Sequence, residues 1–127
     1  MFEKKSYKGK ELELYKQTIK LTEIQREILI GVLLGDASIS LLNGKPVYSI
    51  KFEQSIANID YINHLYLIFE PFVGQIPLEY KNKFIWLRTY RHVCFKFYYD
   101  IFYYGVDNVK KVPKNIEKFL TARSLAY

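Results

Sequence analysis

Two glycines spaced four residues apart lead directly into an aspartate in the apolar run LIGVLLGDAS, residues 29–38. Gly31 and Gly35 share one side of the helix that this run predicts, and small residues there let a second backbone approach closely. Two helices crossing at these glycines would bring two copies of Asp36 together, a costly arrangement unless cations bind between them. Mg²⁺ takes oxygen ligands from one or two carboxylates together with phosphate. The run therefore predicts a divalent-cation site at a helix interface; the alternative is packing within one domain, with Asp36 capping the next turn.

The composition is that of a basic globular domain. The chain has 127 residues, of which 50% are hydrophobic, so one domain with its own core is expected. The net charge of +6 favours a polyanionic partner, either nucleic acid or an anionic membrane surface; the alternative is a basic protein without such a partner. The single cysteine, Cys94, excludes an intramolecular disulfide and indicates a reducing, intracellular compartment. No apolar run is long enough to span a bilayer, so no membrane partner is expected.

The pattern predicts the element order helix, hairpin, helix, hairpin, helix, helix. Thr22 and Gln25 form a capping box at the start of the first helix, and Asn43-Gly44 predicts a tight hairpin turn. Two hairpins together make a four-stranded antiparallel sheet, with helices on one face and the other face open to a ligand.

The remaining boundaries follow from turn residues and breakers. The expected elements are a helix from 58 that Pro71 stops, a second hairpin around Asn82, a helix over 92–105 with Gly105 as its stop, and a last helix from 116. Residues 1–20 are polar and lysine-rich, and predict a basic, loosely attached arm before a single domain over 21–127.

The run LIGVLLGDA resembles the motif of the LAGLIDADG homing endonuclease family. Gly31 and Gly35 fall on the small interface residues of that motif, and Asp36 falls on its metal-binding acid. The segments LTEIQREI, FEQS, FYYDIFYYG and KKVPKNIEKFL followed by SLAY also resemble the intron-encoded branch of the family. The resemblance therefore covers roughly residues 20–127.

This resemblance implies an α+β fold of the order αββαββα, with a saddle-shaped antiparallel sheet lying in the major groove of double-stranded DNA. Two motif helices would pack as the core of a two-fold or pseudo-two-fold interface, here through Ile28, Gly31, Val32 and Gly35. Each helix would contribute an aspartate to Mg²⁺ or another divalent cation. The implied activity is metal-dependent hydrolysis of DNA phosphodiesters at a long recognition site, by a dimer or by two joined halves.

Further site residues follow from the resemblance and from the strand pattern. Gln54 matches a polar residue near the active-site water, and Lys111, or its neighbour Lys110, matches a lysine thought to polarise the phosphate or orient water. The candidates for DNA contact on the sheet and its turns are Ser38, Ser40, Lys45, Ser49, Lys51, Glu53, Lys81, Lys83 and Arg88. Their faces depend on register, and Arg88 shares its parity with the apolar Trp86. His64 and His92 are expected on a helix surface or at a helix start, and not as ligands.

The C-terminal SLAY resembles the tetrapeptide that leads into the second motif of two-motif members. This indicates the first half of a longer enzyme; the competing interpretation is a single-motif homodimer. A lone half is expected to expose an apolar face with Leu29, Val32 and the glycines, and therefore to self-associate. The alternatives in function are an intron RNA maturase and a catalytically inactive DNA-binding half. The richness in Lys, Ile, Asn, Tyr and Phe suggests an AT-rich genome, such as that of a mitochondrion or another organelle.

Overall fold

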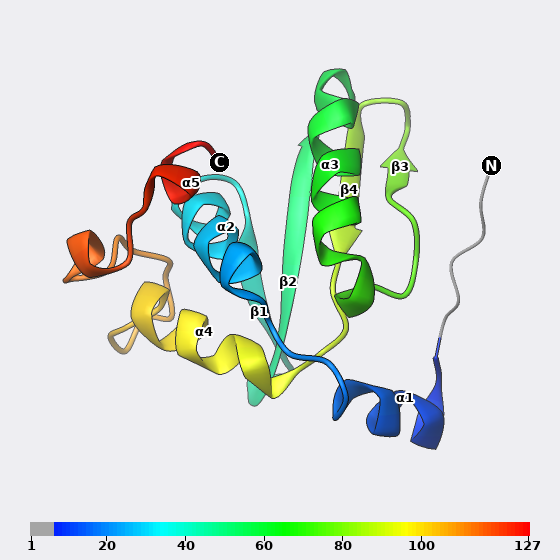
Figure 1. Cartoon of the computed structure of the whole chain (residues 1–127), viewed down its shortest axis with the longest axis horizontal. Helices are drawn as coiled ribbons and strands as arrows, with labels where there is room; N and C mark the ends of the chain where they lie inside the picture. The colour runs from blue at the N-terminus through cyan, green and yellow to red at the C-terminus, as the bar shows by residue number, and fades with distance from the viewer. Residues whose placement is uncertain (1–6) are drawn as a thin grey trace.

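A four-stranded antiparallel sheet forms the centre of the molecule, and the helices cover one of its faces (Figure 1). The structure is a computed structural model that describes residues 7–127. The strand order is β1-β2-β4-β3, and the strands are β1 (Ser38–Leu42), β2 (Lys45–Ser55), β3 (Leu78–Tyr80) and β4 (Phe84–Arg88). The two predicted hairpins therefore join along β2 and β4, which confirms the four-stranded sheet and the α+β class.

Both hairpins turn through two successive residues in the left-handed region. Asn43 and Gly44 have φ values of 52° and 75°, as their sequence predicts. In the second hairpin Lys81 and Asn82 have φ values of 51° and 55°, and the N–H of Lys83 donates to the carbonyl of Tyr80 over 2.9 Å. Lysine rarely adopts this conformation, so the second turn is the less favourable one.

The core lies between the sheet and three helices. These are α2 (Glu23–Leu34), α3 (Ile59–Phe69) and α4 (Lys96–Phe102). Alternate strand residues point toward them and are buried: Ile39, Ile50, Phe52, Ile85 and Leu87. Because side chains alternate along a strand, the residues between them belong to the opposite face, which none of the helices in the described part of the chain covers (Figure 1).

Helix α2 begins with the predicted capping box, but the apolar residues that were expected to be exposed on it are buried. The Thr22 hydroxyl accepts from the N–H of Gln25 over 3.1 Å, and the Gln25 amide oxygen accepts from the N–H of Thr22 over 2.9 Å. The expected exposed apolar face is wrong: Leu29 and Val32 are 0% and 3% exposed. The chain's own C-terminal segment packs on α2 at Gly31, and Leu29 and Val32 are buried within this chain. Self-association therefore does not follow from an exposure of these two residues.

The two ends of the described chain depart from expectation. Residues Gly9–Lys16 form a helix, α1, which specific hydrogen bonds attach to the body: the Tyr15 hydroxyl donates to the carbonyl of Pro71 over 2.5 Å, and the Lys16 ammonium donates to that of Arg91 over 2.7 Å. The first six residues of the expected arm lie outside the described part.

The last predicted helix is interrupted. A 3-10 turn over Ile116–Lys118 is followed by the short helix α5, Ala122–Leu125, which Thr121 caps. His92 stands at the start of the 3-10 turn Val93–Phe95, where its ring accepts from the N–H of Cys94, so this residue is a helix-start histidine as predicted. Between residues 7 and 127 no helix combines the length and apolar character that a bilayer crossing requires.

Candidate metal-binding corner and nucleic-acid interface

Asp36 lies where the chain leaves α2 for β1, and its carboxylate is exposed. The side-chain amide of Gln54, near the end of β2, donates to Oδ2 of Asp36 over 2.8 Å. The amide of Asn58 in turn donates to Oε1 of Gln54 over 3.0 Å. The fold thus joins the two predicted residues Asp36 and Gln54, and it adds Asn58, whose spacing of four residues from Gln54 is the only signal in the sequence.

Lys110 reaches the same place from the loop after α4. Its ammonium donates to the carbonyls of Gly35 and Ala37 over 2.7 and 2.5 Å, one on each side of Asp36. Burial lowers the pKa of this ammonium, while the charge of Asp36 acts in the opposite direction. We refer to Asp36, Gln54 and Lys110 as the Asp36 corner.

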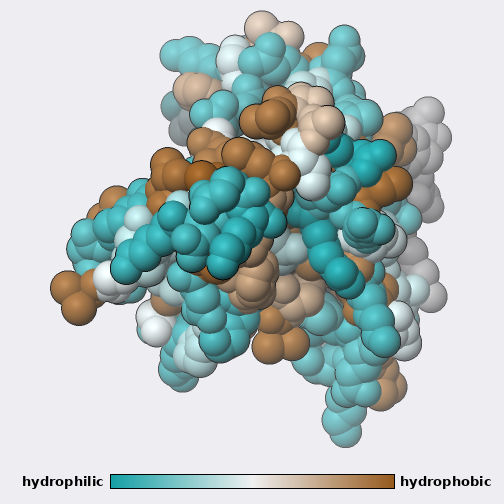
Figure 2. Space-filling view, turned by 60° about the vertical axis from the view of Figure 1, so that its left-hand side comes forward, coloured by the Kyte–Doolittle hydropathy of each residue, from teal (hydrophilic) through white to brown (hydrophobic). Residues whose placement is uncertain are grey.

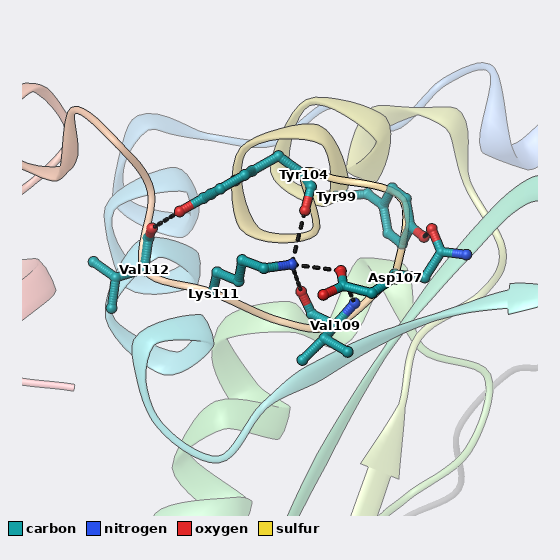
Figure 3. A network of polar contacts seen from close by, with 7 residues as sticks. Tyr99, Tyr104, Asp107, Val109, Lys111 and Val112 are labelled. Atoms are coloured by element: carbon teal, nitrogen blue, oxygen red, sulfur yellow. Dashed lines mark hydrogen bonds and ion pairs between the residues drawn. The ribbon is translucent and has the colours of Figure 1, made fainter.

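Lys111, the first choice of the sequence interpretation, is engaged elsewhere (Figure 3). Its ammonium donates to the carbonyls of Tyr104 and Val109 over 2.9 and 3.2 Å and pairs with the Asp107 carboxylate at 2.5 Å. This pairing also lowers the pKa of Asp107. An ammonium has three N–H donors, and all three are used within this loop. Of the two neighbouring lysines, Lys110 is therefore the one that the fold brings to Asp36.

A cavity of about 150 Å³ lies beside the corner. Asp36 and Gln54 line it together with Tyr61 of α3 and Tyr127, near the C-terminal end. Burial is the main cause that raises the pKa of Tyr61, and the neighbouring Tyr127 and Asp36 add to it. Sequence reasoning missed both tyrosines, because nothing in their local pattern separates them from core aromatics.

The corner supplies few metal ligands by itself. In the described part of the chain, no group of three or more His, Cys, Asp or Glu side chains is placed to hold an ion. Asp36 offers one exposed carboxylate, and carboxylate oxygens suit a hard cation such as Mg²⁺. This chain can therefore contribute part of such a site, and other ligands must come from a phosphate or a second carboxylate.

The two motif glycines have different surroundings. A Cβ at Gly31 would lie 2.1 Å from the carbonyl oxygen of Ser124 in α5, so a second backbone does approach there. That backbone belongs to the same chain, and the Ser124 hydroxyl adds a hydrogen bond to the carbonyl of Glu27 over 2.7 Å. A Cβ at Gly35 would meet nothing nearer than 3.7 Å. Of the predicted interface residues, Ile28, Gly31 and Val32 are buried within this chain, and Gly35 is exposed.

The register places most of the predicted DNA contacts on the uncovered side of the sheet, here called the open face. Ser38 pairs with Lys51, which pairs with Arg88, and cross-strand partners share a face. The predicted residues on this face or at its turns are Ser38, Ser40, Lys45, Lys51, Glu53, Lys81, Lys83 and Arg88. Ser49 shares the parity but is buried, with its hydroxyl 3.2 Å from that of Ser40, so it does not reach the surface.

The parity of Trp86 and Arg88 reflects the real arrangement. Trp86 pairs with Glu53 and Arg88 with Lys51, so both side chains belong to the open face. The Lys51 ammonium lies 5.4 Å from the centre of the Trp86 ring. The expectation that one of the two residues is misplaced, or that the strand twists there, is not needed, because the open face itself carries apolar residues.

Comparison with known proteins agrees with this arrangement. The model of the LAGLIDADG DNA endonuclease family matches residues 26–127. A solved structure, the homing endonuclease I-WcaI bound to its DNA recognition sequence, superposes with a TM-score of 0.76 at 30% identity, covering 94% of this chain and 55% of that one.

Two curated relatives are similar over nearly the whole chain. The "Probable intron-encoded endonuclease 1" of Wickerhamomyces canadensis is 35% identical in an alignment of length 122, which covers 88% of this chain and 51% of the relative. The DNA endonuclease I-ChuI of Chlamydomonas applanata is 28% identical in an alignment of length 124, which covers 86% of this chain and 57% of the relative. The chain thus spans about half the length of the relatives it matches. With the family model covering most of the chain, and the fold and the motif in agreement, the chain belongs to the LAGLIDADG DNA endonuclease family.

Proposed function

We propose that this chain is one half of a site-specific homing endonuclease, which hydrolyses phosphodiesters of double-stranded DNA with the help of a divalent cation. The observation that carries the proposal is the position of Asp36. Its exposed carboxylate stands at the end of α2 and is joined by Gln54 to the end of β2, beside the basic open face. A duplex on that face would bring phosphates to the carboxylate.

In this proposal Asp36 holds the cation, which is Mg²⁺ or a similar ion. When bound, such an ion activates water and stabilises the leaving oxygen. Gln54 fixes one carboxylate oxygen through its amide and leaves the other free for the ion. The ammonium of Lys110, held by the carbonyls that flank Asp36, offers positive charge to the phosphate.

The open face supplies recognition. A two-stranded ribbon fits the major groove, where the four base pairs differ in their donors and acceptors. Serine hydroxyls at Ser38 and Ser40 suit base edges or phosphates, and the basic residues of the face and its turns suit phosphates or guanine.

We further propose that the partner is a second LAGLIDADG half, and not another copy docked through Gly31. The backbone of α5 already occupies the space at Gly31, so a homodimer through this glycine would first have to displace α5. Leu34 and Leu125 of the same two helices remain exposed, and Figure 2 shows apolar surface on the side of the molecule that α2 and α5 form. The match to about half of each relative agrees with this proposal.

Selection from a library of randomised duplexes, with structured RNA as competitor, tests the function. We expect the chain to enrich a defined duplex sequence and to bind it in preference to the RNA. The variant Asp36→Asn should bind the same duplex as the wild-type chain. When the chain is combined with a second half and the assembly cuts the duplex in Mg²⁺, Asp36→Asn should abolish cleavage of the DNA strand whose scissile phosphate lies at Asp36. Binding of RNA alone would contradict the proposal and favour a maturase, and cleavage that survives Asp36→Asn would contradict the role of Asp36.

A further inference from the structure

The outer half of the open face is apolar. Leu78, Tyr80 and Phe84 are 37%, 53% and 44% exposed, and Trp86 is half-buried. Leu78 pairs with Trp86 and Tyr80 pairs with Phe84, so the four side chains form one block on the β3–β4 hairpin. We call these four residues the apolar block. Isolated exposed apolar residues are ordinary, but a contiguous group rimmed by polar residues marks a contact surface.

Cations border this block on the same face, together with Glu53, the cross-strand partner of Trp86, whose carboxylate lies 3.4 Å from the Lys51 ammonium. The Lys51 ammonium lies 5.4 Å from the Trp86 ring centre, and the Lys81 ammonium lies 5.2 Å from that of Tyr80. Lys83 and Arg88 flank it along β4 and its turn. Apolar side chains set among positive charges fit a partner that is strongly anionic and yet carries apolar groups on the surface it presents.

The rim also limits how bases could be held. Single-stranded bases bind by stacking on open aromatic faces. Here the ring faces of Trp86 and Tyr80 each have an ammonium over them, which a stacking base would have to displace. Contact with the edges of paired bases leaves these cations in place, where they can meet the phosphates on either side.

Thymine is the base whose major-groove edge carries an apolar group, the 5-methyl. A shallow recess of about 270 Å³ opens beside the block, lined by Leu78, Trp86 and Ile76, with Arg88 at its border. A methyl group entering this recess would lose its contact with water, while the guanidinium of Arg88 stays close to the neighbouring base pair or phosphate.

From this geometry we infer that the apolar block contacts thymine methyl groups, so that the β3–β4 hairpin selects thymine-containing base pairs in the half-site that it covers. This inference rests on the proposed binding of duplex DNA by the open face. It assigns base specificity to the four residues of the apolar block, none of which is among the DNA-contact candidates predicted from the sequence. The β1–β2 hairpin, with Ser38 and Ser40 on the same face, selects by hydrogen bonds instead.

The test uses duplexes that the full chain selects from a randomised library, in which each thymine is then replaced by deoxyuridine. This change removes only the methyl group and leaves the protein untouched. We expect a cluster of positions where each replacement weakens binding by about fourfold, the value of one buried methyl. When the protein carries Leu78→Ser or Phe84→Ser, replacing these thymines by deoxyuridine should weaken binding little further. Leu67→Ala, which alters a 70% exposed leucine on α3, should keep the full effect.

The possible results separate this inference from the proposed function. If a duplex is selected but no deoxyuridine replacement weakens binding, the inference is wrong and the DNA-binding proposal stands. If the loss persists unchanged in both serine variants, the methyl contacts belong to other residues and the inference is also wrong. If no duplex is selected at all, both fail together.

Discussion

The Asp36 corner and the open face of the sheet meet at the end of β2, and they are built in different ways. The corner joins three polar side chains from positions 36, 54 and 110, each held by hydrogen bonds to its neighbours or to the backbone. On the open face, the strand register alone decides which residues lie side by side, and most of their side chains are exposed. The corner has a fixed geometry suited to chemistry, whereas residues of the face can be exchanged without disturbing the core.

This difference implies that chemistry and recognition are separable in this chain. Changes at the corner should alter cation binding while the affinity for DNA is kept. Changes on the face should alter affinity or sequence preference while the corner is kept. Each of the following variants would break or sharpen that division, beginning with the largest expected effect.

Gly31→Ala should separate α5 from α2. It should thereby disturb the corner, because Tyr127, which follows α5, lines the cavity beside Asp36. The added Cβ would lie 2.1 Å from the carbonyl oxygen of Ser124, a backbone atom that cannot simply rotate away. We expect a loss of about 1–3 kcal/mol in the free energy of unfolding by urea, together with faster amide exchange over 122–127. Leu34→Ala is the control, since it shortens a 38% exposed side chain of the same helix and adds no atom beside α5. Equal small losses in both variants would mean that the close packing at Gly31 does not hold α5.

Lys111→Met should loosen the loop that carries Lys110. The substitution removes the pairing with Asp107 and the hydrogen bonds to the carbonyls of Tyr104 and Val109. Because this ammonium is partly exposed, we expect a modest loss of about 1 kcal/mol, with faster amide exchange over 104–109. Lys110→Met should leave that loop protected. If Lys110→Met opened the loop and Lys111→Met did not, the roles assigned to these neighbours would be reversed.

Lys51→Ala should weaken DNA binding and leave the corner intact. If Lys51 neutralises one phosphate, the affinity falls by roughly three- to tenfold and the slope of log affinity against log salt decreases by about 1. Fluorescence anisotropy across a salt series measures both quantities. Lys96→Ala, on α4 away from the open face, serves as the control. An equal loss in the control would show that only the net charge of the chain matters.

Lys81→Asn should have the smallest effect. It should raise the stability of the fold and lower the affinity for DNA. Asparagine tolerates the φ of 51° better than lysine does, so we expect a gain of about 0.5 kcal/mol in stability. The same change removes a positive charge from the open face and should reduce the affinity for DNA. Urea unfolding and anisotropy on one sample test both parts. A variant that is no more stable would mean that the left-handed lysine carries no strain.

The sequence predicted the framework well because its signals are local. Thr22 and Gln25 specify the start of α2, and Asn43-Gly44 specifies the first turn, each through contacts within a few residues. The open face followed from alternation once the register was known. Alternation alone already put Trp86 and Arg88 on one face, and their pairing with Glu53 and Lys51 showed that this face is the open one.

The sequence was less informative where distant segments meet. Lys110 and Lys111 are chemically identical neighbours, and only the path of the loop decides which one reaches Asp36. The burial of Leu29 and Val32 depends on packing by distant parts of the chain, including α5, which the helix pattern of α2 does not contain. Tyr61 and Tyr127 belong to the cavity only because α3 and the C-terminal segment converge there.

The most direct test of the central claim, that Asp36 supplies cation binding beside an independent DNA-binding face, is a Mn²⁺ titration followed by electron paramagnetic resonance. It compares the wild-type chain and Asp36→Asn, each bound to the same selected duplex, with the affinity for DNA measured separately without divalent ions. We predict that the wild-type complex binds a Mn²⁺ ion that Asp36→Asn lacks, while the two affinities for DNA agree within about threefold. Equal Mn²⁺ binding by both complexes, or loss of DNA binding in Asp36→Asn, would contradict the claim.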